Sequence, residues 1–293
     1  MPMNKLLQLS YLAWWFFRAR FLGRRKPLQS VVFITSGCDS TCRHCSVCTT
    51  PAPHFKSFQE IQQDLDYCYK QGARILDVEG VEILHWNDGS HTINDVFQKA
   101  REKGFYSIST MVPAAHYTQW QKLGVKVDVL WISILHLSDT TLLENLKNVS
   151  LYMVINAQNY EEVPAVLECL QNHKEIQQIA FNFHTPFQGT TSLALSPKQR
   201  AEVIDMLMTY KRKGYKIMNS ISGLKNMLKL NFTPRCWICN FIYCDGRRSP
   251  QCIDDKNSGI CEKCGFSMSG EMNAVFGFKP DTILAGLGIR FYS

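Results

Sequence analysis

The chain has 293 residues, 45% of them hydrophobic, and its 32 lysines and arginines exceed 25 aspartates and glutamates to give a formal net charge of +7. This length and composition are typical of a globular protein with one large or two smaller domains. Six of the bases and none of the acids fall within residues 1–26, so the rest of the chain is close to neutral. A chain-wide basic surface for binding a nucleic-acid backbone is therefore disfavoured.

Twelve cysteines are a high number for this length, and no export signal accompanies them. The apolar run over residues 11–17 is far shorter than the roughly 20 residues that span a bilayer. Arginines follow this run and no small-residue cleavage site appears, which is unlike a signal peptide. We therefore expect a cytoplasmic protein whose reduced thiolates serve metal or redox chemistry.

From residue 31, short apolar runs alternate with longer amphipathic stretches, which is typical of repeated βα units. Ser57 and Glu60 form a capping box before a helix that Gly72 follows. Ser196 before Pro197 suits the start of another helix. Near-continuous apolar strands favour a parallel sheet with helices outside it. Strands are expected at residues 31–35, 75–79, 106–110, 127–133, 150–155 and 179–184, with a seventh near 215–218.

The sequence divides into three parts: a basic aromatic segment over residues 1–30, a βα body over 31–231 and a Cys-rich part over 232–293. Beyond residue 232 the periodicity stops, and we expect a small appendage organised by a metal. Within the body, Cys68 and Cys169 fall in expected helices and are assigned to the core.

Three cysteines follow the first expected strand in the pattern Cys-x3-Cys-x2-Cys, namely Cys38, Cys42 and Cys45. Three thiolates in so short a loop can each bind one iron of a cubane cluster, which leaves a fourth iron open to a substrate group. A zinc site or unrelated buried cysteines are the alternatives. Chance burial is disfavoured, because the carboxyl end of a strand is where βα barrels place their chemistry.

This motif after the first strand resembles the hallmark of the radical S-adenosylmethionine (radical SAM) superfamily, and the resemblance covers roughly residues 31–230. It implies an α/β fold with a partial (βα)6 barrel of the TIM type. To that barrel the sequence adds an N-terminal amphipathic helix and a small Cys-rich C-terminal extension.

The resemblance also implies a [4Fe–4S] cluster ligated by Cys38, Cys42 and Cys45, with S-adenosylmethionine chelated at the open iron. Reduction by an external donor such as flavodoxin or ferredoxin would cleave S-adenosylmethionine and release a 5′-deoxyadenosyl radical. Cys48 is the alternative fourth ligand, which would turn the site into an electron-transfer centre.

Further positions match segments with which family members bind S-adenosylmethionine. Gly80 and Glu82 stand where the family carries Gly-Gly-Glu, which binds the methionyl amino group, although Val81 departs from that pattern. Glu82 has the alternative of being an ordinary polar residue at a strand end. Ser133 resembles the serine that contacts the ribose, and Asn156 is placed to meet the ribose or the carboxylate.

The C-terminal part contains two Cys-x2-Cys knuckles, a spacing whose commonest occupant is structural zinc. The cysteine order resembles the auxiliary-cluster extensions of radical SAM enzymes, the SPASM and twitch domains, and so implies a second [4Fe–4S] cluster with zinc as the alternative. The implied ligands are Cys236, Cys252, Cys261 and Cys264, with Cys239 the main contender and Cys244 a lesser one. The tail CEKCGFSMSGEMNAV also resembles the end of the hopanoid-adenosylating radical SAM enzymes.

Residues 5–26 combine aromatic bulk with basic side chains. This pairing suits an anionic membrane surface at the inner face of the cell membrane. The alternative is a helix laid across the barrel with its arginines in solvent. A surface-bound enzyme would take a lipid, quinone or isoprenoid substrate.

Two classes of function follow. The first is a radical SAM enzyme that acts on a membrane lipid or isoprenoid or, as its rival, on a peptide or protein. The second is a non-catalytic iron–sulfur or zinc-knuckle protein. The six βα units favour the enzyme, because a simple carrier needs no barrel behind its cysteine loop.

Overall fold

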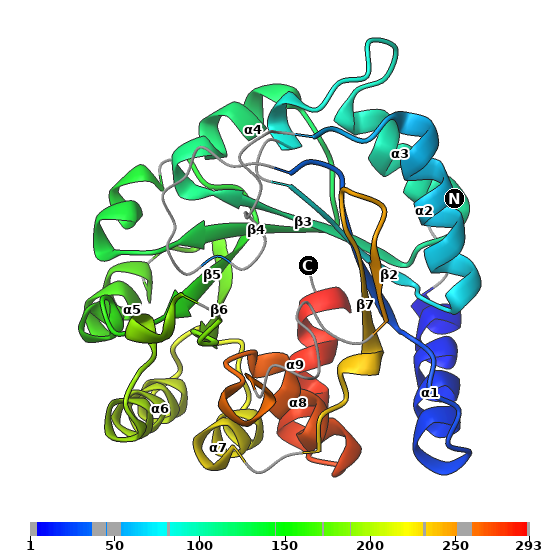
Figure 1. Cartoon of the computed structure of the whole chain (residues 1–293). Coiled ribbons are helices and arrows are strands. Elements are labelled where there is room, and N and C mark those ends of the chain that lie inside the picture. The colour runs from blue at the N-terminus through cyan, green and yellow to red at the C-terminus, as the bar shows by residue number, and fades with distance from the viewer. Residues whose placement is uncertain are drawn as a thin grey trace. The chain divides into compact units, whose positions relative to one another are not determined.

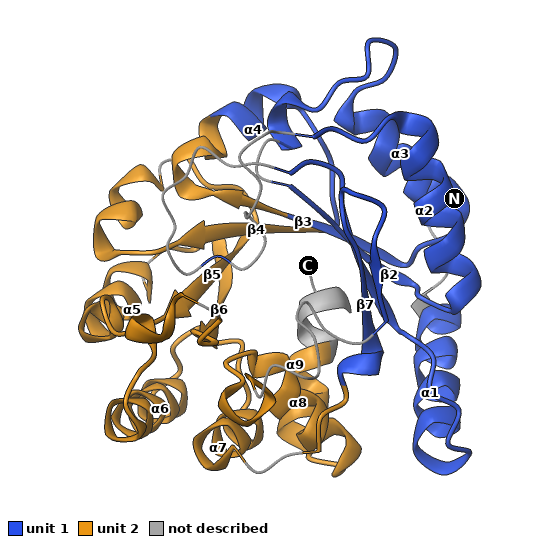
Figure 2. Cartoon of the chain, in the orientation of Figure 1, with its two compact units in different colours: residues 1–110, 119–128, 236–255 blue, residues 111–118, 129–235, 256–293 orange. Residues whose placement is uncertain are grey.

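A computed structural model describes residues 5–36, 45, 54–80, 83–143, 145–171, 173–187, 189–230, 233–250 and 260–291. The chain forms two compact units, which Figure 2 shows in different colours. Unit 1 consists of residues 1–110, 119–128 and 236–255, and unit 2 of residues 111–118, 129–235 and 256–293. The chain therefore enters each unit more than once.

Unit 1 is built around a central parallel strand. β1 (Gln29–Phe33) pairs in parallel with β2 (Ile75–Glu79) on one side and with β7 (Cys239–Ile242) on the other. β2 pairs in parallel with β3 (Ser107–Pro113), and β7 pairs antiparallel with β8 (Arg248–Ser249). The strand order in this unit is β3-β2-β1-β7-β8 (Figure 1).

The helices of unit 1 are α1 (Lys5–Phe21), α2 (Phe58–Gln71), α3 (Ile93–Lys103) and most of α4 (Tyr117–Leu123). The predicted capping box of α2 is present, because Ser57 and Glu60 each accept from the backbone amide of the other. Gly72 ends α2 at a φ of +112°, a conformation that glycine adopts without steric cost. In the described parts of the chain, no helix has the length and apolar character needed to cross a membrane.

Unit 2 contains β4 (Val129–Ile134), β5 (Val149–Ile155) and β6 (Ile176–Phe183), which pair in parallel in the order β6-β5-β4. β3, which has residues in both units, follows β4 in the strand order. The helices of this unit are α5 (Val163–Gln171), α6 (Pro197–Arg212), α7 (Ile221–Lys229), α8 (Ser267–Phe276) and α9 (Pro280–Phe291).

The α/β class is confirmed, and the first six predicted strands coincide with β1–β6 apart from shifts at their ends. Two local predictions were wrong. Residues 215–218 form no strand, since Ile217 makes only an isolated parallel bridge with Ile179. Residues 239–242, predicted to lie in a non-periodic appendage, form β7 and extend the sheet beside β1.

One cysteine assignment was also wrong. Cys68 is fully buried in α2 as predicted, whereas Cys169 on α5 is exposed. Val166, Leu167 and Leu170 form the buried face of α5, and residue 169 lies outside that face. The prediction that Cys169 lies in a helix was therefore correct, but the prediction that it lies in the core was not.

The start of α7 is held by two carboxylates from the C-terminal helices. Glu271 on α8 accepts hydrogen bonds from the backbone amide of Ser220 at 2.9 Å and from its hydroxyl at 2.6 Å. Asp281 on α9 accepts from the amide and the hydroxyl of Ser222 at 2.9 and 2.8 Å. These bonds satisfy amides at the start of α7 that have no partner within the helix. Negative charge on Asp281 is also favourable at this end of a helix.

The ionisation of Glu271 makes this contact pH-dependent. Burial raises its pKa to about 7, although the hydrogen bonds from Ser220 oppose the shift. Because the unfolded side chain titrates near 4.5, the native state binds more protons than the unfolded state between these two values. The stability contributed by this carboxyl is therefore complete at low pH and is lost as the pH rises through 7.

We predict that the wild-type protein loses about 3 kcal/mol of unfolding free energy relative to Glu271→Gln between about pH 5 and about pH 8. Urea denaturation at several pH values measures this difference. Asp281→Asn is the matched control: burial opposes ionisation there, but hydrogen bonds from Ser222 lower the net pKa of Asp281, so its offset from wild type stays constant over this range. A constant offset for Glu271→Gln as well would contradict the prediction.

Candidate active site

The predicted cysteine loop begins at the carboxyl end of β1, and both of its ends are described. Cys38 and Cys42 lie outside the described residues, and Cys45 is half-buried. Because β1, β2 and β7 are parallel neighbours, their carboxyl ends lie at one edge of unit 1. Parallel α/β folds bind their ligands at this edge.

The two ends of the cysteine loop are held side by side by the backbone. The amide of Ser36 donates to the carbonyl of His54 at 2.9 Å, and the amide of Lys56 donates to the carbonyl of Ile34 at 3.0 Å. Between these bonds, Thr35 forms an antiparallel bridge with residue 55. The chain therefore leaves the end of β1 and returns to it at adjacent positions.

A buried thiol reinforces the returning end. Cys244, which follows β7, donates from Sγ to the carbonyl of His54 at 3.2 Å. Burial raises the pKa of Cys244, so its thiol stays protonated and suits this contact. Cys244 thus acts as a structural link between the segment after β7 and the end of the loop.

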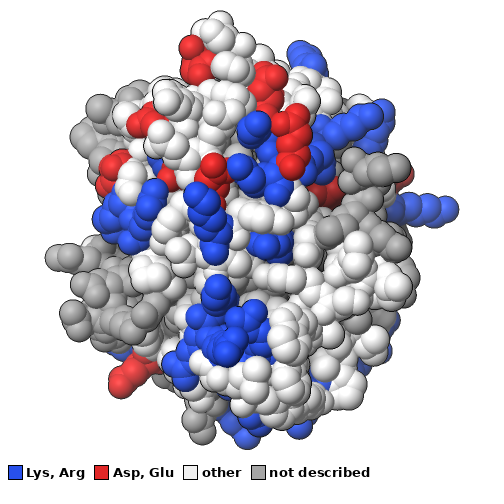
Figure 3. All heavy atoms as spheres, turned by 90° about the vertical axis from the view of Figure 1, so that its right-hand side faces the viewer, with Lys and Arg blue, Asp and Glu red and all other residues white. Residues whose placement is uncertain are grey.

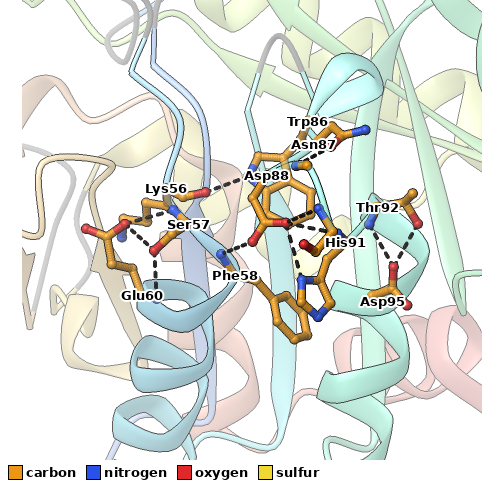
Figure 4. Close-up of polar contacts among 12 residues, drawn as sticks. Lys56, Ser57, Phe58, Glu60, Trp86, Asn87, Asp88, His91, Thr92 and Asp95 are labelled. Carbon is orange, nitrogen blue, oxygen red and sulfur yellow. Dashed lines mark hydrogen bonds and ion pairs between the residues drawn. The ribbon is translucent and has the colours of Figure 1, made fainter.

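The residues that follow the cysteine loop also form hydrogen bonds with the segment after β2 (Figure 4). The indole of Trp86 donates to the carbonyl of Lys56 at 2.8 Å, and the amide of Phe58 donates to the carboxylate of Asp88 at 3.0 Å. The bond from Phe58 and others from the backbone of Ser90 and His91 lower the pKa of Asp88. An ionised carboxylate at the first residue of α2 is favoured by the helix dipole.

A buried ion pair also holds the residues that follow the cysteine loop. The buried ammonium of Lys56 lies 2.5 Å from the carboxylate of Asp64 on α2, and Arg248 on β8 lies 3.6 Å from the other oxygen of that carboxylate. Because the charges are paired, their burial is compensated. The residues that follow the cysteine loop are therefore held by contacts with α2 and with the segments after β2 and β7.

Gly80 at the end of β2 lies directly against Thr35 at the end of β1. Its φ is +155°, and a Cβ at this position would clash with the threonine hydroxyl. Thr35 Oγ1 is itself buried, and no described group forms a hydrogen bond with it. A buried hydroxyl without a partner is unfavourable by about 1–3 kcal/mol, so this atom suits a polar group bound beside the cysteine loop.

Two acids of β2 share one face of the strand, because the side chains of Asp77 and Glu79 are two residues apart. Asp77 accepts hydrogen bonds from Gln29 and Ser109 on the neighbouring strands. Desolvation, with a smaller effect of Asp77, raises the pKa of Glu79 well above its usual value. Glu79 therefore takes up a proton more readily than a glutamate in solvent does. From the sequence this residue received no role, although the alternation in ILDVE predicts its face.

The predicted ligand contacts of unit 2 lie on β4 and after β5. Ser133 on β4 is partly exposed. Asn156 is buried, and its amide oxygen accepts from the backbone of Gln158 at 2.8 Å, so this side chain holds the turn after β5. A contact of either residue with a ligand remains a prediction, and Glu82 lies outside the described residues.

The C-terminal cysteines belong to both units. In unit 1, Cys236 and Cys239 are partly buried, and Cys239 is the first residue of β7. In unit 2, Cys261 is exposed and Cys264 is partly buried. Cys252 lies outside the described residues. Within those residues no three His, Cys, Asp or Glu side chains are grouped to hold a metal, so the ligand set stays a prediction.

The position of Cys264 follows from its neighbour. Phe183 at the end of β6 donates from its amide to the carbonyl of Gly265 at 2.8 Å, and the amide of Gly265 donates to Thr185 Oγ1 at 2.9 Å. A Cβ at Gly265 would overlap the carbonyl of Phe183, so only glycine permits this approach. Cys264 is therefore fixed beside the carboxyl end of β6.

No family model matches the chain, and no curated protein matches its sequence. Solved structures match its fold. SuiB of Streptococcus suis bound to the precursor peptide SuiA has a TM-score of 0.56 and 13% identity, covering 96% of this chain and 70% of the SuiB chain. SuiB bound to S-adenosylmethionine has the same score and identity, over 92% and 68% of the two chains. A histidine-tagged anSMEcpe with bound AdoMet has a TM-score of 0.50 and 11% identity, over 83% and 84%.

We predict that Thr35→Val leaves the unfolding free energy unchanged or raises it by about 1 kcal/mol, because valine keeps the shape and removes a buried hydroxyl that lacks a partner. Thr110→Val is the matched control: Thr110 is also buried, and its Oγ1 donates to the carbonyl of Val78 at 2.7 Å. The control should lose about 1 kcal/mol. Urea denaturation without added ligand measures both, and equal losses would show that Thr35 has a partner.

Proposed function

We propose that this chain, whose fold is that of the radical SAM enzymes, reductively cleaves S-adenosylmethionine at a [4Fe–4S] cluster bound by Cys38, Cys42 and Cys45. The observation that carries the proposal is the place of the Cys-x3-Cys-x2-Cys motif in this fold. The segment that contains it starts and ends at the carboxyl end of β1, between ends that the backbone holds together.

When bound there, the reduced cluster supplies the electron that divides S-adenosylmethionine into methionine and a 5′-deoxyadenosyl radical. Cys38, Cys42 and Cys45 would hold the cluster as thiolates. Thr35 offers a hydroxyl without a described partner, and Gly80 keeps the adjoining backbone free of a side chain. Glu79, whose pKa is raised by desolvation, adds a further polar group next to Gly80. The electron comes from an external donor such as flavodoxin or ferredoxin.

A second [4Fe–4S] cluster in the C-terminal region belongs to the same proposal, with zinc as the alternative metal. The two Cys-x2-Cys pairs support it, and so does the fixed place of Cys264 beside the end of β6. Iron and acid-labile sulfide analysis distinguishes the metals, because zinc would contribute neither.

The substrate is a peptide or a membrane lipid, and a separate observation favours each. SuiB, which matches 96% of this chain in fold, was solved with a bound precursor peptide. The lipid alternative is favoured by the exposed aromatic and basic side chains of α1. Adding peptide pools or extracted membrane lipids to the anaerobic reaction separates the two, because the true substrate raises the rate of 5′-deoxyadenosine formation above its uncoupled level.

We predict that Cys42→Ala abolishes formation of 5′-deoxyadenosine and removes about four irons per chain, because the cluster loses one of its three thiolates. The assay is anaerobic reconstitution followed by incubation with S-adenosylmethionine and dithionite. Cys169→Ala, which changes an exposed cysteine of α5, is the matched control and should retain both cleavage and iron. Cleavage by the Cys42 variant, or no cleavage by a fully loaded wild type, would refute the proposal.

A further inference from the structure

One face of α1 is fixed to the rest of unit 1. The hydroxyl of Tyr11 donates to the carbonyl of Gly72 at 2.5 Å, and the indole of Trp15 donates to the carbonyl of Lys26 at 2.9 Å. Trp15 and Ala19, one turn apart, are buried. α1 therefore packs on unit 1 in a defined orientation, and this orientation determines which of its side chains are exposed.

A second face of α1, here called the aromatic ladder, carries one leucine and three aromatic side chains that are open to solvent. Leu7, Trp14, Phe17 and Phe21 recur at helical spacing on it, and they are 57%, 53%, 44% and 57% exposed. The ring centroids of Trp14 and Phe17 are 5.7 Å apart, and those of Phe17 and Phe21 are 5.3 Å apart. Contiguous apolar surface of this kind on an exposed helix marks an interaction site.

Two arginines border the ladder on opposite sides, since one follows Phe17 and the other precedes Phe21 in the helix. The guanidinium carbon of Arg18 lies 5.9 Å from the ring centroid of Trp14, and that of Arg20 lies 5.5 Å from the ring centroid of Phe21. The turn after α1 adds three exposed bases at residues 24–26. Figure 3 shows lysine and arginine side chains gathered on this side of the molecule, next to uncharged surface.

We propose that this face of α1 docks on an anionic lipid surface, with the helix parallel to the bilayer. The phenyl rings of Phe17 and Phe21 and the indole of Trp14 enter the boundary between headgroups and acyl chains, and the guanidinium groups meet lipid phosphates. This inference concerns α1 alone and holds for either substrate class of the proposed function.

Charge selects a lipid surface over a second copy of this chain. Residues 5–26 carry six bases and no acid, so two such faces in contact would bring like charges together. An anionic membrane supplies the opposite charge over a continuous surface, and each base near it adds to the attraction. The partner that covers this face of α1 therefore needs both negative charge and apolar groups, and an anionic bilayer has both.

The test uses the full chain, loaded with iron and sulfide, and two kinds of vesicle: phosphatidylcholine alone, and phosphatidylcholine with about a third phosphatidylglycerol. The protein should pellet with the anionic vesicles and much less with the neutral ones. Raising the salt to about 0.5 M should release it, because the charges become screened. Binding that is equal to both vesicles and insensitive to salt would overturn the proposal.

Two variants locate the surface. Combining Trp14→Ala, Phe17→Ala and Phe21→Ala, or separately Arg18→Gln and Arg20→Gln, should lower the partition coefficient at least about tenfold. Lys198→Gln with Lys225→Gln, on exposed positions of unit 2, is the matched control for net charge and should bind like wild type. Wild-type binding by the α1 variants would refute the location.

Leu123→Ala with Leu142→Ala is the matched control for exposed apolar surface, and it too should bind like wild type. Circular dichroism confirms that each variant is folded. Brominated lipid should quench wild-type fluorescence, and Trp14→Phe should bind but lose that quenching. If light scattering instead shows a dimer that the aromatic variant dissolves, and neither vesicle pellets the protein, a second copy covers this face and the proposal fails.

Uncoupled formation of 5′-deoxyadenosine, measured without vesicles, separates this inference from the proposed function. The α1 variants should cleave S-adenosylmethionine at the wild-type rate. Cys42→Ala should pellet with anionic vesicles although it cleaves nothing. If the wild-type protein cleaves S-adenosylmethionine but does not dock, only the docking proposal fails. If it docks but does not cleave, only the proposed function fails.

Discussion

Parallel pairing of β1 on both of its edges is the constraint on which the candidate site depends. The register joins Gln29 to residue 75 of β2 and to residue 239 of β7, and the pairing with β2 continues past the strand through the bond from Ile34 to the carbonyl of Glu79. A strand bonded on both sides cannot slide without breaking two ladders, and a shift by one residue would reverse the faces of its side chains. The loop that follows β1 therefore starts from a fixed point.

Elements with strong local signals could be predicted from the sequence. Ser57, Glu60 and Gly72 determine the ends of α2 through contacts within a few residues, so their pattern alone identifies the helix. β7 could not be predicted, because its four residues CNFI are too few to show a period and a cysteine pattern surrounds them. Its partner strand is far away in the chain: Asn240 on β7 bonds to Ser30 on β1, 210 residues earlier.

The sequence indicated residues for the candidate site, whose roles stay predictions, but it did not indicate the contacts around them. The sequence indicated Gly80, but the reason for a glycine there is the hydroxyl of Thr35 on the next strand, which only the pairing of β1 and β2 reveals. The raised pKa of Glu79 likewise depends on tertiary burial. The N-terminal helix has one face toward the protein and one toward solvent, because Trp15 is buried while Trp14, one residue earlier, is exposed. Composition alone cannot separate two faces of one helix.

The pairing of β1 with β7 also has a consequence for the nascent chain. β1, β2 and the cysteine loop leave the ribosome early, whereas the strand that completes the other edge of β1 is made some 210 residues later. Until then the amides and carbonyls on that edge are open to pairing with other chains. Unit 1 therefore cannot complete its sheet during synthesis until β7 has been made, and β1 has one unpaired edge for most of that time.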